Sequence, residues 1–202
     1  LSRHLTQWEV KYGKGEDEET LSGRFAGVIR RASEQTGCGV VVLVDEYDKP
    51  LLQALGNDSL LDDYRKTLKA FYGVLKSSDR YLRFVFLTGV TKFAQVSVFS
   101  DLNQLNDISL DFAYATLCGI TKEELGSTFV PELERQAAVN DMTSEAVMEM
   151  MTRRYDGYHF HPKGAGVFNP FSVLNSFSKQ EFGSYWFQTG TPTFLVELLK
   201  ES

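Results

Sequence analysis

The sequence predicts an α/β fold, a parallel sheet with flanking helices, followed by a mostly helical subdomain. Two short apolar runs, Val40–Val44 and 83–87, are rich in β-branched or aromatic residues and favour strands. The long segment between them carries apolar residues at helical spacing. Two strands joined by a helix are expected to lie parallel, as a βαβ unit.

Two helices are expected before the first strand. Residues 1–12 predict one, and a polar break follows at 13–19. Apolar residues then recur at helical spacing from Leu21 to Ala32, until Gly37 supplies a helix stop. The run Val40–Val44 is apolar at five consecutive positions, so we expect a strand that is covered on both faces.

The later part of the chain gives weaker strand signals. A short strand is one interpretation of 108–112. Thr121 and Glu124 have the spacing of a capping box and open a region that we interpret as helical. The sequence therefore divides into an incomplete α/β core at 1–120 and a mostly helical, lid-like subdomain at 121–202.

Composition indicates a soluble globular protein of the cytoplasm. Of the 202 residues 43% are hydrophobic and 24% charged, and no apolar run approaches the roughly 20 residues that cross a membrane. Cys38 and Cys118 lie too far apart to suggest a disulfide framework or a zinc site. A net charge of −6 argues against direct nucleic-acid binding by this segment. The chain begins at Leu1, within a predicted helix, so we expect a piece of a longer protein.

Two acidic residues end the first predicted strand. Asp45 and Glu46 follow the apolar run in the form of a Walker B motif. Mg²⁺ keeps several waters, so one strand-end aspartate can hold its shell, and the adjacent glutamate can polarise an attacking water. The alternative is a buried strand whose exit acid only caps the helix that begins near Pro50.

A hydroxyl ends the second predicted strand. Thr88 would lie level with Asp45, because the carboxyl ends of parallel strands meet at one edge of the sheet. There it can sense a γ-phosphate or its water. The alternative is an ordinary strand-end threonine, with Gly89 permitting a tight turn. The phosphate-binding motif Gly-x-x-x-x-Gly-Lys-Ser/Thr is absent from this sequence, where Gly15 follows the pair Gly13-Lys14.

Five blocks of the sequence carry a wider resemblance, namely residues 44–50, 83–93, 155–158, 168–172 and 189–195. Together they resemble the predicted AAA-ATPase-like family of Bacteroides-type bacteria. The resemblance implies a partial P-loop-NTPase-type parallel sheet, a Walker A loop upstream of this region and a PD-(D/E)XK nuclease-like domain after it.

The resemblance also implies roles for single residues. Asp45 would hold the Mg²⁺ shell and bind nucleotide, Glu46 would be the catalytic base, and Thr88 the sensor. Gly190 and Pro192 resemble a Gly-x-Pro element that related ATPases place over the nucleotide. ATP and Mg²⁺ are therefore the expected cofactors of the full-length protein, with none tightly bound by this segment and negligible hydrolysis by it alone.

Other polar residues have two interpretations each. Arg154 either faces a phosphate or adjoins a structural turn at 156–157, and His159 and His161 are interpreted as loop residues rather than metal ligands. Asp48 and Lys49 either pair to orient the Walker B loop or are solvated.

Two functions remain open on the sequence alone. One is an ATP-dependent switch that moves the helical subdomain. The other is a degenerate ATPase fold that serves as a protein-interaction module, with association into a homo-oligomer also open.

Overall fold

The computed structural model describes residues 1–89, 98–99 and 104–185. The described residues form two compact units, one up to Leu105 and one from Asn106 onward. The division into a core at 1–120 and a lid-like subdomain at 121–202 remains a prediction. Each unit has its own hydrophobic core.

The first unit contains both predicted strands and the predicted helices. Its elements are α1 (Ser2–Tyr12), α2 (Leu21–Thr36), β1 (Val40–Val44), α3 (Lys49–Gln53), α4 (Asp58–Ser77) and β2 (Leu82–Leu87), with a 3-10 turn at Asp79–Tyr81. Strands β1 and β2 pair in parallel, with Val44 opposite Leu87. The predicted α/β class and the parallel pair joined by a helix are therefore confirmed.

Local sequence signals set the ends of the helices. The Thr20 side chain accepts the backbone N–H of Gly23 at 3.0 Å and begins α2. Gly37 ends that helix in the left-handed conformation, with φ of 67°, which glycine adopts without a steric penalty. The Asn57 side chain accepts the N–H of Leu60 at 3.1 Å and begins α4.

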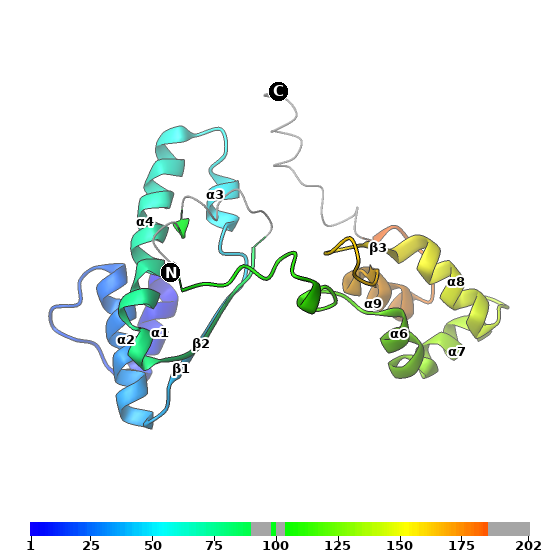
Figure 1. Ribbon diagram of the computed structural model, residues 1–202, viewed down its shortest axis with the longest axis horizontal. Helices are drawn as coiled ribbons and strands as arrows, with labels where there is room; N and C mark the ends of the chain where they lie inside the picture. The colour runs from blue at the N-terminus through cyan, green and yellow to red at the C-terminus, as the bar shows by residue number, and fades with distance from the viewer. Residues whose placement is uncertain (90–97, 100–103, 186–202) are drawn as a thin grey trace. The chain divides into compact units, whose positions relative to one another are not determined.

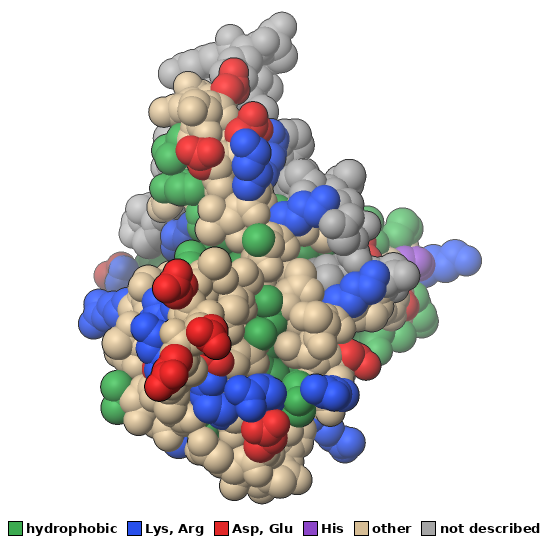
Figure 2. All heavy atoms as spheres, turned by 90° about the vertical axis from the view of Figure 1, so that its left-hand side faces the viewer, with side chains coloured by type: hydrophobic (Ala, Val, Ile, Leu, Met, Phe, Trp, Pro, Cys, Tyr) green, Lys and Arg blue, Asp and Glu red, His purple; other side chains and the backbone are tan. Residues whose placement is uncertain are grey.

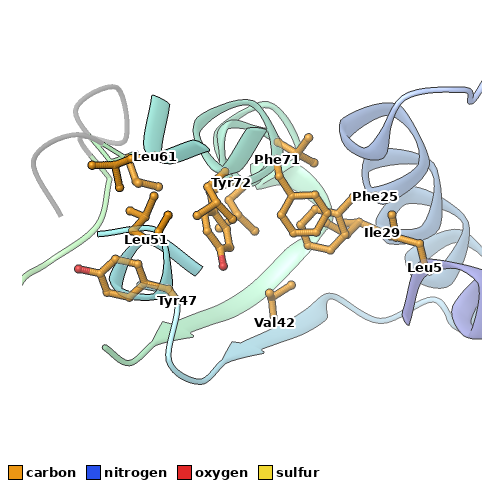
Figure 3. Close-up of a cluster of buried hydrophobic side chains, with 14 residues drawn as sticks. Leu5, Phe25, Ile29, Val42, Tyr47, Leu51, Leu61, Phe71 and Tyr72 are labelled. Carbon is orange, nitrogen blue, oxygen red and sulfur yellow. The ribbon is translucent and has the colours of Figure 1, made fainter. Parts of the chain in front are cut away.

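The core of the first unit lies between the parallel strands and the helices α1, α2 and α4, which Figure 1 shows on one side of them. The rings of Phe25 and Phe71 stack with centroids 4.4 Å apart. Figure 3 shows this pair above Val42 of β1, and Tyr47 and Tyr72 nearer the carboxyl end of the strand. The helices therefore fix the position of the strand end.

The other face of the parallel pair is exposed within the described part of the chain. Val41 and Leu43 are 52% and 70% exposed, and their neighbour Phe84 on β2 is 54% exposed. We call Val41, Leu43, Phe84 and Phe86 the open face. The expectation that β1 is covered on both faces is not met by the described residues, because α1, α2 and α4 all pack on the opposite face.

Two ion pairs tie helix α2 to the segment before it. Arg24 donates from two nitrogens to the Glu9 carboxylate, each at 2.7 Å, and Arg31 binds Glu18 in the loop between the helices. Figure 2 shows acidic and basic side chains intermingled on the side of the molecule that it presents.

The second unit is mostly helical. Its elements are a 3-10 turn at Phe112–Tyr114, α6 (Lys122–Thr128), α7 (Val130–Val139), α8 (Ser144–Tyr155), β3 (Asp156–Tyr158), β4 (Val167–Phe168) and α9 (Pro170–Lys179). The predicted capping box at Thr121 and Glu124 is present. The strand suggested for 108–112 is wrong, since the Asp111 side chain accepts the N–H of Ala113 at 2.9 Å and begins a 3-10 turn.

The core of the second unit comes from all four of its described helices together with strand β4. Leu125, Met151, Phe168 and Val173 are almost completely buried there. None of the helices in the described parts of the chain is long and apolar enough to cross a membrane.

Candidate functional site

The candidate site lies at the carboxyl ends of β1 and β2, where backbone hydrogen bonds continue beyond the strands. The N–H of Thr88 donates to the carbonyl of Val44 at 2.8 Å, and the N–H of Tyr47 donates to the carbonyl of Thr88 at 2.9 Å. The loop after β1 is therefore fixed to the end of β2, and the residues of both loops keep a defined register.

Three residues that the sequence predicts to act together meet at this edge. The Thr88 hydroxyl donates a hydrogen bond to Oδ1 of Asp45, and it accepts the backbone N–H of Glu46 at 3.3 Å. Both carboxylate residues are exposed and Thr88 is half-buried. The structure thus brings the Thr88 hydroxyl to the Asp45 carboxylate and to the backbone of Glu46. Hydroxyl and carboxylate oxygens are hard ligands of the kind that Mg²⁺ prefers.

Glu46 has an unusual backbone and a basic neighbour. Its φ is 51°, in the left-handed region that is uncommon for residues other than glycine. Its carboxylate accepts a hydrogen bond from Nζ of Lys49 at 2.5 Å, and this bond raises the pKa of Lys49 above its ordinary value. Both side chains are about half exposed, so the pair contributes little to stability. Lys49 therefore pairs with Glu46 near the start of α3.

Asp48 is a buried carboxylate that the sequence alone does not distinguish from a solvated one. Its exposed fraction is 0%, and that of the adjacent Tyr47 is 8%. Burial, together with the charge of Asp48, raises the pKa of Tyr72 to about 12. No sequence signal indicates this burial. In the folded chain the Asp48 side chain lies close to Gly89, and its charge acts on Tyr72 of α4.

A hollow of about 1100 Å³ in the first unit reaches the two exposed carboxylates. All five residues of β1 line it together with Asp45 and Glu46, and its other walls come from α1, α2 and α4. Those walls are largely apolar, with side chains such as Phe25, Ile29 and Phe71. A polyphosphate needs backbone N–H groups and basic side chains instead, so these helix walls do not form a phosphate cradle.

Arg154, Gly190 and Pro192 were expected to bind nucleotide. Arg154 lies in the second unit, where Nη1 donates to the carbonyl of Phe182 at 2.8 Å, and the adjacent Tyr155 donates to the carbonyl of Gly183 at 2.9 Å. Both contacts tie the segment after α9 to the end of α8. Gly190 and Pro192 lie outside the described residues. The nucleotide-binding roles of all three residues remain predictions.

Of the two loop histidines, His161 has defined neighbours within the second unit. Nδ1 of His161 accepts the N–H of Lys163 at 3.0 Å, and its ring packs edge-on against Phe112. Among the described residues, no group of three or more histidine, cysteine, aspartate or glutamate side chains is arranged to hold a metal ion. A Mg²⁺ ion carried in by a nucleotide needs fewer protein ligands than that.

The first unit is similar in sequence to a known protein family. Residues 1–99, all within that unit, match the model of the AAA-ATPase-like family, described as predicted AAA-ATPases. The match supports a general ATPase-like assignment for this part of the chain.

A curated relative extends the similarity over the second unit. A protein of Azotobacter chroococcum mcd 1, described as an uncharacterized protein in the vnfD 5' region, is 45% identical over 201 residues. The aligned region is 100% of this chain but only 37% of that relative. No solved structure gives a significant match.

Proposed function

We propose that Asp45, Glu46 and Thr88 form the hydrolytic half of a Mg²⁺–ATP site. The observation that carries the proposal is the Thr88 hydroxyl, which bridges the Asp45 carboxylate and the Glu46 backbone at the shared carboxyl edge of two parallel strands. Ligands of open parallel sheets bind at this edge. The family match over residues 1–99 agrees with this chemistry.

Each of the three side chains has a distinct role in this proposal. Asp45 would hold Mg²⁺, which would supply positive charge to the phosphates, and Thr88 orients the attacking water. Glu46 polarises that water, which attacks the γ-phosphorus and passes its proton toward the carboxylate. The bond from the γ-phosphorus to the bridging oxygen breaks, and ADP leaves with the electron pair.

The phosphate cradle is proposed to come from polypeptide outside these 202 residues. This sequence holds no Gly-x-x-x-x-Gly-Lys-Ser/Thr motif, and the curated relative is considerably longer than this chain. We therefore expect negligible ATP hydrolysis by residues 1–202 alone, and activity in a longer protein that supplies such a loop. The nuclease-like domain, the P-loop-type sheet and movement of the helical unit by ATP hydrolysis are further proposals about that protein.

The test is the substitution Glu46→Gln in the longer protein. It removes the proton acceptor but keeps the shape of the side chain, so we expect ATP turnover to fall by about 10²-fold or more, with little change in nucleotide affinity. Glu34→Gln, on the exposed face of α2, is the matched control and should leave turnover unchanged. Undiminished turnover in the Glu46→Gln protein would refute the role of Glu46.

A second candidate function is a degenerate ATPase fold that binds another protein. The open face favours it, because apolar side chains as exposed as Leu43 and Phe84 are typical of interaction sites. The two functions differ in their need for nucleotide. If the longer protein fails to bind ATP with Mg²⁺ in an equilibrium binding assay, the interaction module is the better description.

A further inference from the structure

We infer that the carboxyl end of α9 is a two-state element, in which the helix either stops at Lys179, as observed, or continues for about one more turn and stops at Gly183. The inference concerns the second unit alone and goes beyond the proposed ATP site, on which it does not depend. Three features of residues 180–185 carry it. They are a strained backbone at the end of the helix, a set of side chains that hold the chain beyond it, and a local sequence suited to a longer helix.

The observed end of α9 has a backbone conformation that usually belongs to glycine. Gln180 follows the helix with φ of 56°, in the left-handed region. The N–H groups of Gln180 and Glu181 both donate to the carbonyl of Ser176, the second at 3.3 Å, which is the Schellman arrangement of a helix end. A residue with a side chain is sterically disfavoured at this position. Gln180 therefore keeps its conformation because surrounding groups hold it.

Four side chains hold the backbone that follows. The carbonyl groups of residues 180, 181, 182 and 183 accept hydrogen bonds, in that order, from Asn140 at 3.1 Å, Ser176 at 2.6 Å, Arg154 at 2.8 Å and Tyr155 at 2.9 Å. We call these four side chains the carbonyl clamp. They come from the end of α7, from α8 and from α9 itself. Because its partners are backbone atoms, the clamp determines the path of the chain.

The buried part of the clamp is incompletely hydrogen-bonded. Ser176 and Gln136 are both 0% exposed, and Nε2 of Gln136 donates to Oγ of Ser176 at 3.0 Å. The other polar atom of that amide, Oε1, is buried without a partner among the described residues. A buried acceptor left unpaired costs free energy, and the left-handed backbone of Gln180 adds strain. Both costs lower the preference for the observed state.

The local sequence fits a longer helix. Residues 180 and 181 are glutamine and glutamate, which are good helix formers, and Phe182 is tolerated in a helix. Gly183 would then follow the last helical residue, where glycine commonly ends a helix. The sequence thus places the usual helix stop at 183 and not at 180.

In the observed state Gly183 is in close contact with Tyr185. A β-carbon on Gly183 would lie 2.8 Å from Cζ of Tyr185, so the absence of a side chain lets the ring approach. Tyr185 is buried beside the ring of Tyr155, and its hydroxyl donates to the carbonyl of Glu181 at 3.0 Å. A helix rises about 1.5 Å per residue and an extended chain about 3.3 Å, so a longer α9 draws Tyr185 away from this position. The two states therefore differ in whether Tyr185 packs in the core.

The first experiment removes two hydroxyl groups of the clamp in the whole chain. The double variant Tyr155→Phe/Ser176→Ala loses the donors to residues 181 and 183 and keeps the aromatic ring. The Cα chemical shifts of residues 180–182, measured by NMR, should move to helical values. The helical fraction there should rise about tenfold or more, as expected for two lost hydrogen bonds. Tyr158→Phe and Ser178→Ala, at exposed positions, are the matched controls and should leave these shifts unchanged.

The second experiment changes residue 180, both in the otherwise wild-type chain and in the double variant. Gln180→Gly should hold the observed stop, because glycine accepts the left-handed conformation and is a poor helix former, whereas Gln180→Ala should favour the longer helix. The helical fraction of residues 181–182 should be at least about fivefold higher in Gln180→Ala than in Gln180→Gly. Equal fractions in the two variants overturn the inference. The comparison in the otherwise wild-type chain decides if the double variant does not fold.

Disorder in place of a longer helix is the contrary outcome. If residues 180–182 of the double variant take the shifts of a disordered chain while α9 still ends at Lys179, the second state does not exist. The shifts of Leu125 and Val147, which are completely buried in the core of the second unit, should keep their wild-type values. A general change at these core residues without helical shifts at 180–182 likewise contradicts the inference.

Discussion

A single hydroxyl connects the two loops of the candidate site. Thr88 uses its one O–H toward Asp45 and one lone pair toward the N–H of Glu46. Serine can make both contacts, whereas valine has nearly the same shape and can make neither. The pair of substitutions therefore isolates the hydroxyl from the packing of the side chain.

We predict that Thr88→Val lowers the stability of the first unit by about 0.5–1.5 kcal/mol, the net value of a hydrogen bond, and that Thr88→Ser lowers it less. Urea denaturation followed by the fluorescence of Trp8, which lies on α1, measures the difference when the second tryptophan, Trp186, is replaced by phenylalanine in all variants. Equal losses in the two variants would assign the effect to the methyl group and contradict the role given to the hydroxyl.

At this scale the sequence predicted part of the site. Asp45, Glu46 and Thr88 could be paired in advance because parallel strands end at a common edge, and the structure places them together. The burial of Asp48 could not be foreseen. Gly89 and Tyr72 are near Asp48 only in the packed fold, because they lie far from it along the chain.

At the scale of elements, the contact between α1 and α2 depends on a largely buried ion pair. Arg24 binds both carboxylate oxygens of Glu9, and the exposed fractions of the two side chains are 12% and 7%. The hydrogen bond from Arg24 lowers the pKa of the Glu9 carboxyl below its ordinary value of 4.5. A carboxyl whose pKa is lower in the folded state stabilises the fold above the unfolded-state pKa.

We predict that Glu9→Gln lowers the thermal stability of the first unit at pH 7. Because the stabilisation by Glu9 is lost as the pH falls through its lowered folded-state pKa, the difference between variant and wild type should shrink as the pH falls below 4.5. Melting temperatures measured between pH 7 and pH 3 test this. Glu34→Gln, from the exposed pair with Arg30, is the control and should show little change at any of these pH values.

The sequence predicted best the long elements, in which apolar residues recur many times at one constant spacing. Helices α2 and α4 have 16 and 20 residues, enough for the apolar spacing to be unambiguous. Strands β3 and β4 have three and two residues, which is too short for an alternating pattern. Their pairing depends on the helical unit around them, with Phe168 completely enclosed by its core.

At the scale of the whole molecule, the described residues form two units with separate cores. Damage to one core should therefore leave the other largely intact. The sequence predicted a mostly helical second half. The functional division proposed for 1–120 and 121–202 remains a prediction, because the structure shows compact units and not their roles.

We predict that Met151→Ala, which removes a fully buried side chain, destabilises the second unit by about 2–5 kcal/mol. Hydrogen exchange should become faster in α7, α8 and α9, while the amides of β1 and α4 keep their wild-type rates. Uniformly faster exchange in both units would show that the two cores unfold as one.

The open face also governs how this chain behaves in concentrated solution. In the open face, the apolar side chains of Val41, Leu43 and Phe84 are exposed to water on a pair of short strands. Such a face associates with other apolar surfaces, including the same face on a second molecule. Residues 1–202 in isolation should therefore aggregate at high concentration. Their solubility should increase when another polypeptide covers the open face.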